Sequence, residues 1–363
     1  MRLFLLNYLL LLSICVVRAQ ERSDFYFTHV NGENGLSASN VKAILQDSYG
    51  FMWFGTKNGL NRYDGTSILQ FDCDDLEEGT GNHNIGALFE DKERNLWVGT
   101  DRGVYIYNPA VDVFKRFKIA SSEGITLDNW VAEILSDSLD NIWVLIPDQG
   151  LFRYKDGKVH HYSLLDKDNL KNNNPECICI NEQGEVWIGT SGVGLFKYNY
   201  RDDKFEQYLA DRMGRSLIGK TIISICFQKE NAILGIHEGD LLKYNTRTDE
   251  LSEVSFLGEK KTFLRDVMCF GDEIWVGSLH GIFIINEKEN NVIHLKEDLM
   301  RSFSLSDNSI YSIYKDHEGG IWIGTMFGGV NYLPNRILTF DKYVPGSDSH
   351  SLNTKRIRGL AED

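Results

Sequence analysis

One short phrase returns along almost the whole chain: an apolar residue, Trp, a β-branched or aromatic residue, Gly and Thr. Taking the Trp position as the mark, copies occur at steps of 42 to 47 residues, at Trp53, Trp97, Trp143, Trp187, Ile233, Trp275 and Trp322. A repeat period in this range is typical of solenoids, propellers and arrays. Each unit is therefore expected to be one supersecondary module that packs against its neighbours.

Each unit is expected to fold as four antiparallel strands. In the first unit the strand-like runs are residues 41–46, 51–56, 60–63 and 68–71, separated by turns rich in Asp, Asn and Gly. Short β-branched or aromatic runs bounded by such residues are typical of strands joined by hairpins. Four strands in about 45 residues make one propeller blade. The predicted fold class is therefore all-β, a seven-bladed β-propeller of four-stranded antiparallel blades.

The repeated Trp residues are expected to be structural. Each lies on the second strand of its unit, where the indole can wedge between adjacent sheets, and the Gly two residues later lets a neighbouring backbone come close. Burying an indole removes roughly 150–250 Å² from water and stabilises the fold by about 4–6 kcal/mol at most. Unit three has Leu145 in place of the Gly, and unit five has Ile233 in place of the Trp, so these blades should be the least regular.

The N-terminal residues are expected to serve export and ring closure. Residues 1–19 combine Arg2, an apolar run and a small final residue, Ala19, which predicts a secretory signal peptide and a periplasmic location. Residues 25–30 look like the outer strand that ends other units. We expect this strand to pair with the last blade near residues 329–333.

The resulting propeller would span residues 22–335. Beyond it, residues 351–357 repeat the opening of the seventh unit at an offset that matches the repeat step. Residues 336–363 therefore predict the truncated start of a second propeller. A blade cannot bury its face with one strand, so we expect the chain to be the front part of a longer polypeptide or the product of an interrupted reading frame.

The cysteines are expected to be free. Five remain once a signal peptide is removed, namely Cys73, Cys177, Cys179, Cys226 and Cys269. The number is odd, the last four fall on predicted inner strands, and their spacing matches no zinc-binding pattern. Buried thiols are therefore favoured over a disulfide or a metal site. We expect neither a metal nor a cofactor.

The first unit also carries a family resemblance. It includes Gly-Leu-Ser at residues 35–37, Val41, and Gln-Asp-Ser-Tyr-Gly-Phe-Met-Trp-Phe-Gly-Thr-Lys-Asn-Gly-Leu-Asn-Arg-Tyr-Asp-Gly at residues 46–65. This combination resembles the two-component regulator propeller repeat, which forms the periplasmic sensor region of hybrid two-component systems in glycan-using bacteria. The resemblance covers residues 22–363. It implies an oligosaccharide ligand, a homodimer, and membrane attachment and a histidine kinase in a downstream segment, so this chain would be a sensor without enzymatic activity.

A ligand is expected on the face where the loops after the second strand of each blade surround the central opening. These loops offer mixed donors and acceptors with some apolar surface, as a neutral or weakly charged sugar needs. The candidate ligand-binding residues are Lys57, Asn58, Asp101, Arg102, Asp148, Gln149, His237, Glu238 and His280. Trp130 joins them because it begins an inner strand where other units have Asn or Ser. Its ring could stack on a sugar or could plug the space between blades two and three.

Other function classes remain open. A net charge of −14 argues against nucleic acid as a partner. A propeller lyase or glycosidase would need catalytic groups that converge on the axis. Asp101, Asp148 and Glu238 lie on the expected face, but no motif links their three blades, so no catalytic residue is assigned. A protein-binding scaffold would instead show a broad exposed apolar patch.

Overall fold

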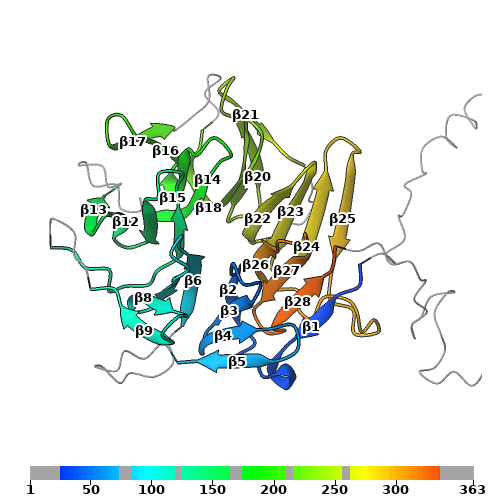
Figure 1. Ribbon diagram of the computed structural model, residues 1–363. Coiled ribbons are helices and arrows are strands. Elements are labelled where there is room, and N and C mark those ends of the chain that lie inside the picture. The colour runs from blue at the N-terminus through cyan, green and yellow to red at the C-terminus, as the bar shows by residue number, and fades with distance from the viewer. Residues whose placement is uncertain are drawn as a thin grey trace, which may run out of the picture.

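The structure, a computed structural model, describes residues 25–72, 84–118, 124–163, 174–208, 216–255 and 262–335. These residues form 28 strands and one short 3-10 helix, η2 (Gly32–Asn34), so the chain is all-β as predicted. Within this part of the chain the strands make six antiparallel sheets, five of four strands and one of eight. The sheets follow one another in chain order around a central axis (Figure 1). The predicted signal peptide and second propeller lie outside the described residues.

The first three units each form a separate four-stranded sheet, in which the strands pair in chain order. The first sheet contains β2 (Val41–Gln46), β3 (Met52–Thr56), β4 (Gly59–Tyr63) and β5 (Ile68–Phe71). The second contains β6 (Ile85–Glu90), β7 (Leu96–Thr100), β8 (Gly103–Asn108) and β9 (Val113–Arg116). The third contains β10 (Glu133–Ser136), β11 (Ile142–Ile146), β12 (Gly150–Lys155) and β13 (Lys158–Tyr162). Unit three thus keeps the four-stranded arrangement although Leu145 replaces its Gly.

Units four and five share the eight-stranded sheet. Unit four supplies β14 (Pro175–Ile180), β15 (Val186–Val193), β16 (Leu195–Asn199) and β17 (Lys204–Tyr208). Unit five supplies β18 (Ile218–Gln228), β19 (Asn231–Ile236), β20 (Leu241–Asn245) and β21 (Glu250–Glu253). They join because the end of β15 pairs with the start of β18, where Ser191 lies opposite Thr221 and Val193 opposite Ile218.

The last two units complete the ring. Unit six contains β22 (Leu264–Phe270), β23 (Glu273–Ser278), β24 (Gly281–Asn286) and β25 (Asn291–Leu295). Unit seven contains β26 (Ile310–Lys315), β27 (Ile321–Thr325) and β28 (Val330–Leu333), and its fourth strand is the N-terminal β1 (Thr28–Val30). Thr28 pairs with Tyr332 and Val30 with Val330, which confirms the predicted closure. The innermost strand of unit seven, β26, also contacts β2 of unit one.

The hydrophobic core lies between neighbouring sheets, and the repeated Trp residues fill it. Trp97, on β7, is 2 % exposed and packs 5.6 Å from Tyr154 of the third sheet, measured between ring centroids. Trp322, on β27, packs 5.6 Å from Phe54 of the first sheet. The predicted wedge role of these indoles is therefore confirmed.

The Gly of the repeated phrase makes room for the next sheet. A Cβ at Gly99 would lie 2.6 Å from Cγ1 of Val131, the residue that precedes the inner strand of unit three by two positions. A Cβ at Gly324 would lie 2.5 Å from the backbone oxygen of Val41. Either contact is far shorter than van der Waals distance, so a side chain here would push the sheets apart.

An aspartate in the first turn of most units fixes the Trp. Asp47 accepts hydrogen bonds from the backbone nitrogens of Tyr49 and Phe51 at 3.0 and 2.9 Å and from Nε1 of Trp53 at 2.7 Å. The same carboxylate-to-indole bond recurs in other units as Asp91–Trp97, Asp137–Trp143 and Asp316–Trp322. One side chain thus closes the turn and satisfies the buried indole N–H.

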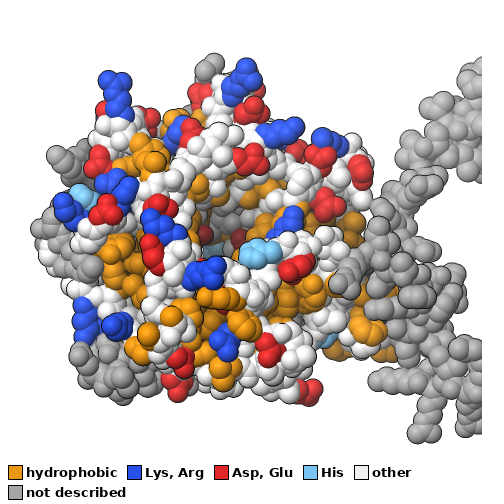
Figure 2. Space-filling view, in the orientation of Figure 1, with side chains coloured by type: hydrophobic (Ala, Val, Ile, Leu, Met, Phe, Trp, Pro, Cys, Tyr) orange, Lys and Arg blue, Asp and Glu red, His pale blue; other side chains and the backbone are white. Residues whose placement is uncertain are grey.

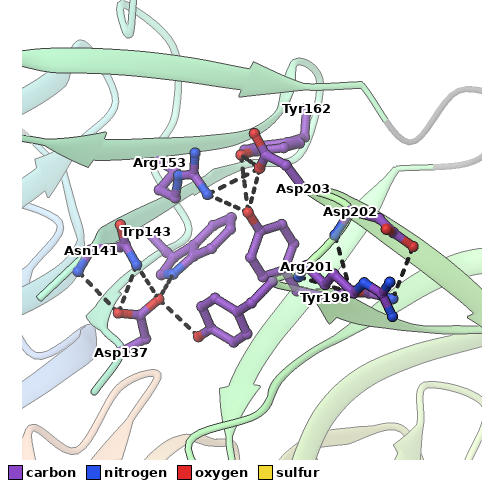
Figure 3. A network of polar contacts seen from close by, with 11 residues as sticks. Asp137, Asn141, Trp143, Arg153, Tyr162, Tyr198, Arg201, Asp202 and Asp203 are labelled. Atoms are coloured by element: carbon purple, nitrogen blue, oxygen red, sulfur yellow. Dashed lines mark hydrogen bonds and ion pairs between the residues drawn. The ribbon is translucent and has the colours of Figure 1, made fainter. Parts of the chain in front are cut away.

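The third sheet and β16–β17 meet in an extended polar network (Figure 3). Asp137 accepts from Nε1 of Trp143 at 2.9 Å, from Nδ2 of Asn141 at 2.7 Å and from the Tyr200 hydroxyl at 2.9 Å. Burial raises the pKa of Asp137, but these hydrogen bonds outweigh it and hold the pKa below the usual value. Arg153 donates to Asp203 at 3.0 Å nearby.

Two inner strands are covalently linked. Cys226 of β18 and Cys269 of β22 form a disulfide with a Cα–Cα distance of 5.8 Å, so the prediction of free thiols was wrong for this pair. The two residues lie on adjacent inner strands, within the Cα separation that a disulfide requires. Cys177 and Cys179 are free, as predicted. Cys73 lies outside the described residues.

Candidate functional site: the central cavity

The ring encloses a central cavity of about 390 Å³. Its lining comes from the seven inner strands, β2, β6, β10, β14, β18, β22 and β26 or the residues beside them. Figure 2 shows the hollow at the centre of the ring. We number positions along each inner strand from its buried apolar residue, such as Val41 in unit one and Ile310 in unit seven. The second positions are occupied by Lys42, Gly86, Ala132, Glu176, Ile223, Arg265 and Tyr311.

One side of the cavity carries two cations and two aromatic rings. Nζ of Lys42 lies 4.5 Å from the ring centroid of Trp130 and 5.9 Å from that of Tyr311. Cζ of Arg265 lies 5.9 Å from the Tyr311 centroid. Such separations place the cations within range of the electron-rich ring faces. We call Lys42, Arg265, Tyr311 and Trp130 the cationic cluster.

Trp130 reaches this cluster across Gly86. A Cβ at Gly86 would lie 2.6 Å from Cη2 and Cζ2 of Trp130, so only Gly leaves space for the indole. The half-buried ring therefore covers the inner strand of unit two and contacts Lys42 of unit one. It lies beside the cavity lining rather than only between units two and three.

The charge of Lys42 is poorly compensated. Burial lowers the pKa of Lys42, and the positive charges of Lys57 and Arg265 lower it further, whereas Asp101 raises it. Within the described part of the chain, neither Lys42 nor Arg265 forms an ion pair. Lys57 and Asp101, two of the predicted loop residues, thus lie close enough to Lys42 to act on it.

Two carboxylates lie deeper, at the third positions of their strands. Oε2 of Glu133 accepts a hydrogen bond from the backbone nitrogen of Ile178 at 2.8 Å. Burial, with a smaller contribution from the negative charge of Asp266, raises the pKa of Glu133 to about 8. Asp266 accepts from the backbone nitrogen of Ile313 at 2.8 Å and from Oγ of Ser224 at 3.0 Å, and burial raises its pKa too.

These third-position bonds all run from one unit to the next. Glu133 of unit three reaches unit four, Ser224 of unit five accepts from the backbone nitrogen of Val267 in unit six at 3.0 Å, and Asp266 of unit six reaches unit seven. Each side chain satisfies a backbone N–H of a neighbouring inner strand. The deeper carboxylates therefore hold sheets together.

The remaining predicted loop residues make local contacts. Among the ten candidates, Lys57, Asn58, Asp101, Arg102, Asp148, Glu238 and His280 are exposed, and Trp130, Gln149 and His237 are partly buried. The His237 ring packs 5.0 Å from that of Phe263, and Nδ1 of His280 lies 2.7 Å from Oγ1 of Thr262. Asp148 raises the pKa of Glu176, second to the effect of burial. The contacts of these four loop residues do not include the cationic cluster.

The prediction from the loops missed Lys42, Arg265 and Tyr311. They lie on inner strands, which were expected to be mostly small and apolar. The signal was present in the repeat, because aligned units place Gly86 and Ala132 where Lys42 stands. Among the described residues, no group of three or more His, Cys, Asp or Glu side chains could hold a metal ion.

Comparison with known proteins identifies the repeat. The two component regulator propeller family matches residues 35–58, 79–102 and 304–327. These segments include the Trp phrases of the first, second and seventh units. The chain carries two-component regulator propeller repeats. A relative named Histidine kinase P4, from Formosa agariphila, is 25 % identical over 158 residues, which cover 42 % of this chain and 12 % of the kinase.

Solved structures show that these repeats build a β-propeller. The extracellular domain of a proposed hybrid two component system from B. thetaiotaomicron superposes with a TM-score of 0.73 at 24 % identity, covering 93 % of this chain and 46 % of that one. The extracellular domain of a proposed one component system from the same organism gives a TM-score of 0.72 at 24 % identity, covering 86 % and 40 %. The chain thus spans less than half of either domain.

An enzyme shares the same fold. A streptogramin B lyase superposes with a TM-score of 0.65 at 15 % identity, covering 85 % of this chain and 97 % of the lyase. The propeller by itself is therefore compatible with binding and with catalysis. Among the described residues, no helix has the length and apolar character needed to cross a membrane.

Proposed function

We propose that this chain is the ligand-sensing propeller of an exported two-component sensor, and that its ligand is an oligosaccharide bound at the mouth of the central cavity. The observation that carries the proposal is the cationic cluster, in which a partly exposed indole lies beside charged donors at an opening of about 390 Å³. Apolar or aromatic surface with a few placed polar groups is what a small-ligand site requires. The regulator repeats support a sensory role.

We also propose seven blades, with the eight-stranded sheet counted as the blades of units four and five. Export through the segment 1–19, a homodimer, and coupling to a kinase in a longer polypeptide belong to the same proposal. The Cys226–Cys269 disulfide supports an oxidising compartment. The net charge of −14 disfavours nucleic acid as a partner.

The test is binding of neutral and acidic oligosaccharides to the purified chain, followed by thermal unfolding and calorimetry. A ligand should raise the unfolding temperature of the wild type. The shift should fall sharply in Trp130→Ala and persist in Tyr49→Ala, which removes an aromatic ring exposed in the turn between β2 and β3. Equal binding by all three proteins would place the ligand elsewhere, and no binding by any oligosaccharide would refute the proposal.

A lyase or glycosidase is the alternative that the fold allows. The deeper carboxylates at Glu133 and Asp266 support binding instead, because both are hydrogen-bonded to backbone nitrogens of the next unit. Chromatography of the same oligosaccharides after incubation with the chain separates the two functions. Cleaved products that disappear in Glu176→Gln would favour catalysis.

A further inference from the structure

The cationic cluster is at odds with the charge of the whole molecule. The chain has a net charge of −14, yet Lys42 and Arg265 face the same cavity from β2 and β22. The strand between them in the ring, β26, contacts both and places Tyr311 between the two cations. Three consecutive units thus present cation, aromatic ring and cation in order.

The carboxylates that line the cavity do not neutralise this cluster. Asp266 is hydrogen-bonded to Ser224 and to the backbone of Val267 and Ile313, and Glu133 to the backbone of Ile178. Glu176 stands at the second position of β14, in unit four. Asp101 acts on Lys42 from the loop, but more weakly than burial, Lys57 and Arg265 do.

A partly buried cation without a counter-charge is unfavourable unless a ligand supplies one. Both cations also lie next to an aromatic ring, and Trp130 extends the arrangement to unit two. A sugar ring can pack on an indole face while an acidic substituent on that ring pairs with the adjacent ammonium and guanidinium groups.

We propose that the mouth of the cavity binds an acidic sugar residue, whose carboxylate or sulfate group pairs with Lys42 and Arg265 while its ring packs on Trp130. This inference rests on the proposed sugar-sensing function and specifies its ligand class. It differs from the expectation from the loops alone, which was a neutral or weakly charged sugar. Carboxylate and sulfate share the chemistry that the cluster recognises, and the experiment below separates them.

The experiment measures binding of three oligosaccharides to the full chain by calorimetry: an oligogalacturonate, a sulfated galactose oligomer and the neutral galactose oligomer. The variants are Lys42→Met and Arg265→Met, which keep apolar bulk and remove the charge. Lys158→Met, at an exposed position on β13, is the matched control. Thermal unfolding without ligand verifies that each variant folds.

At least one acidic oligomer should bind about tenfold or more tightly than the neutral one, and its affinity should fall several-fold as the salt concentration rises. Lys42→Met and Arg265→Met should each weaken acidic binding about tenfold or more, and Lys158→Met should not. Preference for the galacturonate identifies a carboxylate ligand, and preference for the sulfated oligomer identifies a sulfate.

Two results overturn the inference and differ in what they leave standing. If the neutral oligomer binds as tightly as the acidic ones and requires Trp130, sugar sensing stands but the acidic ligand class is wrong. The same conclusion follows if acidic binding survives in both Met variants. If none of the three oligomers binds, the inference fails together with the proposed function.

Discussion

Replacing Glu133 with Gln should stabilise the protein by an amount that grows with pH. The pKa of Glu133 rises from its usual 4.5 to about 8 on folding. An acid that holds its proton more tightly in the folded state lowers the stability as pH rises through this interval. At about 1.36 kcal/mol per pKa unit the full interval corresponds to roughly 5 kcal/mol. Because Glu133 lines the cavity, which water can enter, we expect about 2–5 kcal/mol.

Gln keeps an oxygen that can accept the Ile178 N–H and removes the charge. The assay is thermal unfolding of wild type and Glu133→Gln, with the disulfide intact, at pH 5 and pH 9. At roughly 2 °C per kcal/mol the variant should gain about 4–10 °C over wild type at pH 9, and far less at pH 5. Glu93→Gln, on the surface, is the control and should show no such difference. A gain that is equal at both pH values, or a loss at pH 9, would refute the reasoning.

Three further predictions concern stability. Reducing the Cys226–Cys269 disulfide should destabilise the protein by up to about 4 kcal/mol in the loop-entropy model, read as a denaturant midpoint that responds to reductant in wild type but not in the double Ser variant. Gly99→Ala should cost ~1–3 kcal/mol by crowding the next sheet, whereas Gly32→Ala, with no heavy atom within 4 Å, should change the unfolding temperature little. Tyr200→Phe should cost about 1 kcal/mol near neutral pH. In acid denaturation series that cost should vanish once the turn carboxylate that Tyr200 contacts is protonated, because its lowered pKa contributes stability only while it is ionised.

The fold followed from the sequence because a repeat states the same local information many times. Strand boundaries in unit one agree closely with the expectation, since Gly and Asp mark each turn. The pairing of β1 with β28 was also predictable, because an open ring of sheets leaves one outer strand missing. The joining of units four and five was not, since it depends on how far β15 continues past its hairpin.

The disulfide was missed although its signal was present. Cys226 and Cys269 are 43 residues apart, close to one repeat step. In a propeller that spacing places two residues at nearly the same height on adjacent sheets, where their side chains meet. Counting cysteines gave an odd number and suggested free thiols, whereas comparing their separations with the period would have paired these two.

The candidate site was only half predictable for a related reason. Loops are where ligand-binding residues concentrate, and this rule led to Lys57, Asp101 and Trp130, which the structure places around Lys42. Lys42 itself lies on an inner strand, where strand propensity and burial patterns do not distinguish a core position from a cavity-lining one. Only the geometry of the closed ring shows that the second positions face open space.

The inner strands divide their work by position. First positions are uniformly apolar and buried, because they fill the space left by the Gly of the preceding unit, as Val131 does against Gly99. Third positions bridge to the next strand, as Glu133 does to Ile178. The second positions carry seven different residue types at seven equivalent places, from Gly86 to Arg265. Packing that repeats so regularly elsewhere cannot require this variety. We therefore infer that the second positions are where this propeller's recognition chemistry resides, with the fold around them held constant by the other two.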